Sequence, residues 1–175
     1  NADAFIAPIA NNGSALLKFT YMGTGLFDAI YGITFDRQAI PYIMGTSEGA
    51  WPVQNAAWSV AGSKQFIAKV EPDLTGFIYS TVWGSGSPRP NISPVAFLVD
   101  RCENVYVSGW GGWIVPNAND AYNMAGTVGM PTTPDAIKST TDNRDMYFIV
   151  IRKDATALLY GTFFGQSGGE GEHVD

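Results

Sequence analysis

The sequence has few side chains of the kinds that most often perform catalysis or bind metals. Its 175 residues include a single cysteine, Cys102, and a single histidine, His173. One cysteine allows no intramolecular disulfide, and a zinc site needs several Cys or His ligands. A Ser-His-Asp or Cys-His arrangement would depend on His173, near the last residue, where we expect an exposed side chain rather than a general base. The sequence therefore predicts no complete active site, no metal and no cofactor, and we expect a protein that is not an enzyme.

Charge is also scarce, and so are long apolar runs. Charged residues make up 15% of the sequence and hydrophobic residues 46%, and the net charge is −6. An acidic surface does not attract phosphate groups, which argues against nucleic-acid binding. No run approaches the roughly 18 apolar residues of a membrane-spanning helix. A glycosidase needs a pair of carboxylates, but the spacing of the 16 acidic residues selects no pair.

The sequence does contain an internal repeat. A ten-residue apolar pattern that ends in glycine occurs at residues 14–23, 75–84 and 156–165. A shorter pattern, in which Ile follows Phe, begins at Phe5, Phe66 and Phe148. Repetition of a supersecondary unit at this spacing is typical of propellers, solenoids and other arrays. The repeat thus predicts architecture, and it carries little information about chemistry.

Short apolar segments between turn residues divide the repeat into four-stranded units. The strands expected in the two complete units are 32–35, 40–44, 65–70 and 76–83, then 94–99, 104–108, 146–151 and 157–164. Residues 4–9 and 16–22, joined by a turn at 11–13, supply the last two strands of an earlier unit.

These units predict an all-β fold, a partial β-propeller of about two and a half blades in a single domain. The expected parts are a half blade at 4–22, blades at 30–84 and 92–165, and a linker to a missing blade at 166–175. A closed propeller needs at least four blades. We therefore expect the partner to be the remainder of the propeller or another protein chain, and the sequence to be a piece of a longer array.

The repeated segments resemble SBBP repeats, a bacterial β-propeller repeat family. The resemblance rests on DAFIA at 3–7, FIAK at 66–69, IYSTVWG at 78–84, VDRCENVYVSG at 99–109 and MPTTPDAI at 130–137. Glu103, where the family pattern has Gly, and the first hairpin, with Gln38 and Pro41, depart from it. The resemblance implies a secreted or cell-surface bacterial protein. Aromatic-rich versions of this repeat imply gliding, Bacteroidetes-type bacteria and type IX secretion.

Positions that are apolar in every copy of the repeat are expected in the core. Trp83 aligns with Met22 and Phe164, Trp51 aligns with Met130, and Trp58 aligns with Ile137. Packed sheets favour large apolar side chains between them, so we expect all three tryptophans to be structural. Asp36 and Asp100 are repeat mates at a turn between strands, where we expect each to hydrogen-bond its own turn backbone.

An insertion at 110–129 has no counterpart in the repeat. It begins with Trp110 and Trp113, which have no apolar repeat mates. The polar and aromatic residues that follow include Asn117, Asn119, Asp120 and Tyr122. Exposed aromatic rings beside Asn and Asp are typical of protein or sugar contacts. The alternative is a long loop that folds back on its own blade and buries both rings.

Three functions are consistent with this sequence. The first is a non-enzymatic structural or interaction module of an exported bacterial cell-surface protein. The second is a carbohydrate-binding propeller surface centred on the insertion. The third is a fragment of a propeller hydrolase or lyase whose catalytic residues lie largely in other parts of the protein.

Overall fold

The computed structural model describes residues 2–111 and 125–166. These residues form three antiparallel sheets of two, four and four strands, and none of the sheets is closed. The strands are β1 (Ala4–Ile6), β2 (Thr20–Met22), β3 (Asp28–Phe35), β4 (Pro41–Ser47), β5 (Gln65–Val70), β6 (Phe77–Trp83), β7 (Ser93–Val99), β8 (Val105–Trp110), β9 (Met146–Ile151) and β10 (Leu158–Phe164), with one 3₁₀ turn, η1 (Lys153–Ala155). The prediction of an all-β fold is confirmed. None of the described residues forms a helix long and apolar enough to cross a membrane.

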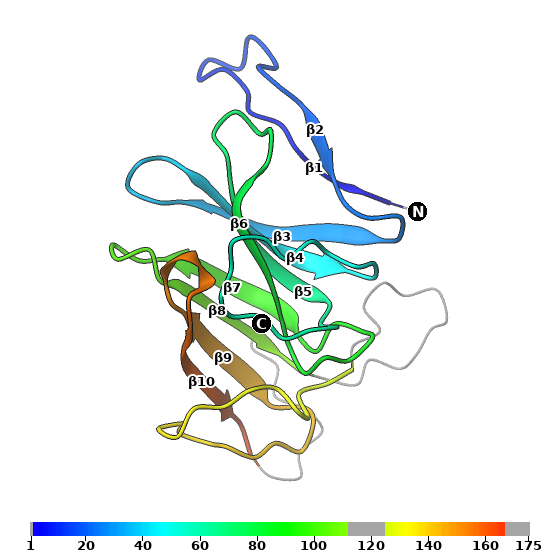
Figure 1. Cartoon of the computed structure of the whole chain (residues 1–175), viewed down its shortest axis with the longest axis vertical. Coiled ribbons are helices and arrows are strands. Elements are labelled where there is room, and N and C mark those ends of the chain that lie inside the picture. The colour runs from blue at the N-terminus through cyan, green and yellow to red at the C-terminus, as the bar shows by residue number, and fades with distance from the viewer. Residues whose placement is uncertain (1, 112–124, 167–175) are drawn as a thin grey trace.

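Each four-stranded sheet is a meander, in which strands adjacent in sequence are also paired. The orders are β3-β4-β5-β6 and β7-β8-β9-β10, so both predicted four-stranded units are confirmed. Every residue of β4 and β5 is buried, which is expected of central strands covered on both faces of their sheet. Figure 1 shows the three sheets one after another, from β1–β2 at the top to β7–β10 at the bottom.

The first pair of strands is shorter than predicted. The sequence suggested strands at 4–9 and 16–22, but regular pairing covers three residues on each strand, and beyond it only Ile9 and Leu16 form an isolated bridge. Pro8 lies in this gap and has no N–H to donate to a ladder. The predicted turn at 11–13 is present, with Gly13 at a positive φ of 70°.

Long connections run along the outer edges of β6 and β10. In the first connection, Gln54 and Ser80 exchange two backbone hydrogen bonds of 2.9 and 2.8 Å, and Val60 N donates to Val82 O at 2.9 Å. In the second, Thr133 N donates to Gly161 O at 3.0 Å, and Phe163 N donates to Lys138 O at 3.0 Å. The two sheets thus have their outer edge strands covered in the same way.

Strand register corrects one part of the repeat alignment. Phe66 pairs with Gly45 and Val82. The equivalents of these two partners in the second four-stranded sheet are Gly109 and Phe163, and both of them pair with Tyr147. The repeat mate of Phe66 is therefore Tyr147, and the predicted match to Phe148 was wrong. A shift of one residue moves a side chain to the opposite face of the sheet, and the similarity of the Phe-Ile pairs concealed that shift.

The two faces of each four-stranded sheet can be named by these mates. We call front the face that carries Tyr42, Ile67 and Trp83 in β3–β6 and their mates Tyr106, Phe148 and Phe164 in β7–β10. We call back the opposite face, which carries Phe66 and Val82 in β3–β6 and Tyr147 and Phe163 in β7–β10. The same pairings place Met22 on the front of β1–β2 and Phe5 on its back.

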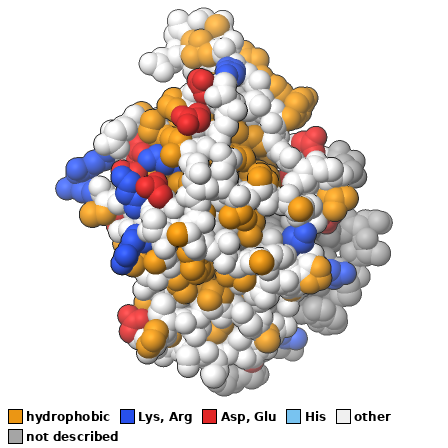
Figure 2. All heavy atoms as spheres, in the orientation of Figure 1, with side chains coloured by type: hydrophobic (Ala, Val, Ile, Leu, Met, Phe, Trp, Pro, Cys, Tyr) orange, Lys and Arg blue, Asp and Glu red, His pale blue; other side chains and the backbone are white. Residues whose placement is uncertain are grey.

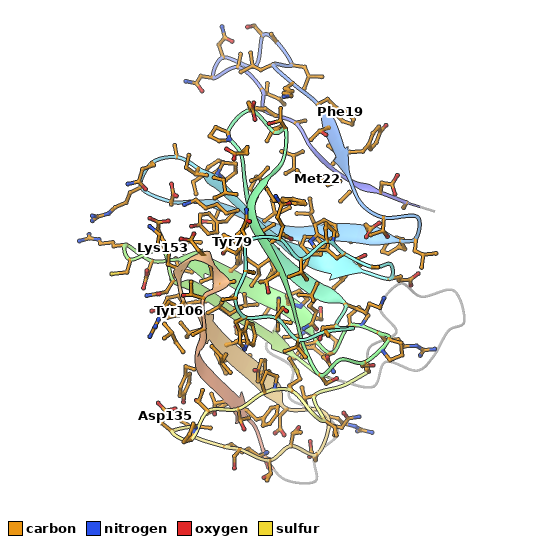
Figure 3. The ribbon with its side chains drawn as sticks, in the orientation of Figure 1. Phe19, Met22, Tyr79, Tyr106, Asp135 and Lys153 are labelled. Carbon is orange, nitrogen blue, oxygen red and sulfur yellow. The ribbon has the colours of Figure 1, made fainter. Side chains whose placement is uncertain are left out.

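The sheets pack front to back. The front of β3–β6 contacts the back of β7–β10 in a buried cluster that includes Tyr42, Met44, Ile67, Tyr79, Trp83, Val107, Tyr147, Ile149 and Phe163. The back of β3–β6 contacts the front of β1–β2 through Ile43, Phe66, Val82 and Met22. Figure 3 shows Met22 between β2 and the β3–β6 sheet. One packing arrangement therefore occurs twice along the chain.

Trp83 and Trp51 are buried, as the repeat predicted. The Trp83 ring stacks near Tyr147 of the next sheet, with 6.5 Å between the ring centroids. Trp51 stacks on Phe66 at 3.5 Å between centroids and donates from Nε1 to Ser80 Oγ at 2.9 Å. Trp58 is half-buried and packs against the cluster between the two four-stranded sheets.

Candidate functional site

The front face of β7–β10 is uncovered, although its repeat mates form the core. Phe164 is 57% exposed where its mate Trp83 is 0% exposed, and Phe148 is 36% exposed where Ile67 is 1% exposed. A hollow of about 520 Å³ lies on this face. Its lining includes Leu98, Tyr106, Phe148, Val150, Tyr160 and Phe164. We call this surface the open front face, and no described part of the chain lies over it.

The open front face follows directly from the strand pattern. Alternate residues of a strand point to opposite faces, so a strand that is apolar at nearly every position presents two apolar faces. β9 reads MYFIVI, and its Tyr147 and Ile149 are buried against β3–β6. Phe148 and Val150 then point to the other side. Exposed apolar patches of this kind mark sites where another surface binds.

Ile137 is a second residue of this sheet without the inter-sheet contact that its repeat mate makes. Its repeat mate Trp58 donates from its backbone N to Ala155 O at 2.8 Å and so reaches the following sheet. Ile137 is 77% exposed. The expectation that both positions belong to the core is wrong for Ile137, because no described sheet follows β7–β10 for it to contact.

A second uncovered surface lies at the other end of the molecule, between β1 and β3. A groove of about 400 Å³ is lined by residues that include Phe5, Ile6, Pro8, Ile33, Phe35 and Leu74. Ile33 is 51% exposed, whereas its repeat mate Phe97 packs against the cluster between the sheets. The β1–β2 sheet has two strands, whereas each of the others has four. Strands that would cover the back of β3 are therefore not among the described residues.

A cluster of charged groups crosses the interface between the two four-stranded sheets. Lys69 Nζ lies 2.9 Å from Asp36 Oδ2 and 2.7 Å from Glu103 Oε2. Lys153 Nζ lies 2.7 Å from Glu103 Oε1, and the Tyr42 hydroxyl donates to Glu103 Oε2 at 3.2 Å. Figure 2 shows acidic and basic side chains gathered at the left edge, and Figure 3 places Lys153 there, close to the turn between β7 and β8. We call this group the inter-sheet ion cluster.

The inter-sheet ion cluster holds its members in their charged forms. Hydrogen bonds from Lys153 and Lys69 lower the pKa of Glu103 from 4.5 to about 2. Burial opposes the charge of Lys69, but hydrogen bonds to Glu103 and Asp36 outweigh it and raise the Lys69 pKa. A depressed carboxyl pKa stabilises the folded state above the unfolded value, so this contribution is lost as pH falls from about 4.5 toward 2. Two ammonium groups facing two carboxylates make a structural clamp rather than a centre for proton transfer.

The ion cluster belongs to one interface and not to the repeat. The register makes Val150 the mate of Lys69, and the two turns make Ala39 the mate of Glu103. A sheet that covered the open front face would therefore meet Val150 in place of Lys69, and a carboxylate at the position of Glu103 would lose the cation that the preceding sheet supplies. Charge at this position thus favours one order of stacking.

Asp36 and Asp100 hydrogen-bond their own turns, as predicted. Asp36 Oδ1 accepts from Gln38 N and Ile40 N, both at 2.9 Å, and Asp100 Oδ1 accepts from Cys102 N at 2.7 Å and Asn104 N at 2.9 Å. Glu103 has a φ of 64°, a region that L-residues rarely adopt. Glycine adopts this conformation most readily.

Most of the binding residues predicted from the insertion lie outside the described residues. These are Trp113, Asn117, Asn119, Asp120 and Tyr122. Trp110 ends β8, where it pairs with Ser93 and Met146 and is half-buried. The insertion therefore stays a prediction, as does the exposed position of His173. Within the described ranges, no three His, Cys, Asp or Glu side chains are grouped so that they could hold a metal ion.

Sequence reasoning expected the remainder of a propeller or another chain as partner, but it did not name the open front face, because the residues of this face have the composition of a core. The one available signal was positional. Phe164 and Ile137 belong to the last copy of the repeat that the structure describes, so no described copy follows to cover them.

No protein-family model matches the sequence, and no curated protein is significantly similar to it. The two four-stranded sheets are instead similar to each other in strand order, in register, in the Asp turns and in the covering of their outer edges. By this internal similarity, the open front face is equivalent to the front of β3–β6, which is buried against the next sheet.

Proposed function

We propose that this chain is part of a β-propeller and serves as a non-enzymatic structural and interaction module of an exported bacterial cell-surface protein. The observation that carries the proposal is the repeated front-to-back contact between sheets. This contact buries Trp83, whereas its mate Phe164, over which no described sheet lies, is exposed. The open front face then acts as the docking surface for the next blade or for another protein chain.

The shape of the interface supports a propeller over a flat stack. Backbone contacts between the two four-stranded sheets are concentrated at their first strands, β3 and β7. At β3, a Cβ atom on Gly32 would lie 3.0 Å from the Phe97 ring. Toward the outer strands, large rings such as Trp83 and Tyr147 fill the space. Sheets that are close on one side and separated by large side chains on the other form a wedge, as blades around an axis do.

The chemistry of the described residues supports a module without catalysis. The buried Asp36 and Lys69 and the half-buried Glu103 neutralise one another across an interface. The buried Asp145 carboxylate pairs with Lys138 at 2.5 Å. Each of these groups has a structural partner.

Adding one more sheet tests the stacking proposal. A longer chain in which residues 85–166 are repeated after Gln166 is expected to place the added sheet on the open front face and to raise the melting temperature. The added copy of Glu103 would keep its own copy of Lys153 but would meet Val150 in place of Lys69, so replacing that copy by Ala should lower the melting temperature less than replacing Glu103 itself. Melting curves and hydrogen exchange of β10 measure both effects. Unchanged β10 exchange in both chains would contradict the proposal.

Export rests on the resemblance to SBBP repeats and can be tested with Cys102, which is exposed. A membrane-impermeant maleimide is expected to label this thiol on intact cells that export the protein, and the Cys102→Ser variant should remain unlabelled. Labelling that requires cell lysis would show that the protein is not displayed at the surface.

A further inference from the structure

We propose that this chain associates head to tail with a second copy of itself, so that the back of β1–β2 in one copy covers the open front face of the other. The inference rests on the front-to-back stacking in the proposed function and names a specific partner for it. Each described copy carries one uncovered front and one uncovered back.

The back of β1–β2 is an aromatic surface of the kind that covers fronts elsewhere in the chain. The register makes Phe5 the mate of Phe66 and Tyr147, and it makes Tyr21 the mate of Val82 and Phe163. All of these mates are buried, whereas Phe5 is 59% exposed and Tyr21 is 69% exposed. A third ring, Phe19, lies between them, with its centroid 5.4 Å from that of Phe5 and 4.9 Å from that of Tyr21.

The existing interface between β3–β6 and β7–β10 serves as the template for the contact. There, front rings such as Trp83 receive back rings such as Tyr147. In the proposed contact, the front positions are occupied by Phe148, Tyr160 and Phe164, and the back positions by Phe5 and Tyr21. Both surfaces are apolar and aromatic, and β1–β2 supplies the equivalents of β9 and β10, the last two strands of a covering sheet.

Charge also favours this pairing. Val150 lies at the front position of β7–β10 that is equivalent to Lys69 in β3–β6. Lys69 binds a carboxylate of the sheet that covers it, and Val150 cannot. Strands β1 and β2 read AFI and TYM and so contribute no charged side chain. The back of β7–β10, by contrast, brings Glu103 into its contact, and it is already covered within the chain. Among the described sheets, β1–β2 therefore presents an uncovered back whose strands bring no charge into the contact.

A head-to-tail contact either closes into a ring or continues as a filament. The described part of each copy forms three sheets, so two copies supply six sheet positions, which lies within the roughly four to eight blades of closed propellers. The proposal is therefore a two-copy ring that contains the same contact twice.

Complementation between two variants of the full chain tests the proposal. Phe148→Asp places a charge on the front, Tyr21→Asp places one on the back, and both positions are exposed, so we expect both variants to fold. By sedimentation, the unmodified chain should be a dimer, and each variant alone should be a monomer because both contacts in the ring are lost. An equimolar mixture of the two variants should form a dimer through the one contact that remains intact. Val53→Asp, at an exposed position on the first outer connection, should behave as the unmodified chain.

An unmodified chain that is monomeric at about 100 µM, in the micromolar range of weak contacts, would overturn the proposal. Assembly of the unmodified chain beyond a dimer would also overturn it, and so would an equimolar mixture of the two variants that stays monomeric. A monomeric unmodified chain that is nevertheless stabilised by an added sheet would reject the second copy as partner and leave the stacking of sheets intact. Circular dichroism of each variant checks that a lost dimer is not a lost fold.

Discussion

Trp83→Ala is expected to lower the free energy of unfolding by about 3–5 kcal/mol, whereas Phe164→Ala, at the equivalent position of the next sheet, should lower it by less than about 1 kcal/mol. The two residues lie on equivalent strands, at the same register and on the same face of their sheets. They differ in whether another sheet lies over them. Trp83 is fully buried against Tyr147, and its removal leaves a cavity between the two four-stranded sheets. Phe164 has no described sheet above it.

Urea denaturation followed by circular dichroism measures both losses. The protein should be dilute enough to be monomeric, because association would bury Phe164 and enlarge its contribution. Equal losses for the two variants would mean that the open front face is covered in solution, even in the dilute chain. A small loss for Trp83→Ala would contradict the packing of β3–β6 on β7–β10.

Lys69→Met is expected to lower the free energy of unfolding by about 3–5 kcal/mol, because it leaves two carboxylates at a buried interface without their shared cation. The Asp36 side chain is 1% exposed and the Glu103 side chain is 17% exposed. Lys153→Met removes the same charge from a side chain that is 48% exposed and should lower stability by at most about 1 kcal/mol.

Acid gives an independent test of the same clamp. Protonation of the carboxylates removes their need for a cation, so the difference between Lys69→Met and the unmodified chain should narrow as pH falls below about 4.5. Chemical denaturation at a series of pH values measures this difference. A constant difference would show that Lys69 acts through its packed side-chain carbons rather than through its charge.

The strands were predictable because each is marked by its own residues. Short apolar segments and the turns at Asp36 and Asp100 defined the two meanders to within a few residues. The register of β9 was not predictable, because Tyr147 and Phe148 are adjacent rings and sequence similarity favoured the wrong one. Only pairing with Gly109 on β8 decides between them.

The candidate site was harder to predict for two physical reasons. An apolar side chain such as Phe164 has the same identity whether a sheet covers it or not, so sequence alone could not distinguish core from open surface. The ion cluster joins Lys69 of β5 to Glu103 of a distant turn, and no local pattern connects residues that meet only after two sheets have stacked. The sequence instead predicted a binding site in the insertion at 110–129, because the composition of that segment is unusual.

The connections along the outer edges of β6 and β10 have a consequence for how such chains avoid aggregation. An uncovered edge strand is a template on which any extended chain can add and begin an amyloid-like fibril. Here Gln54, Val60, Thr133 and Lys138 already use the backbone groups that such a chain would need. With those edges sealed, new material can be added to the four-stranded sheets face to face, where side chains select the partner. A protein with large exposed aromatic faces can thus remain selective about what adheres to it.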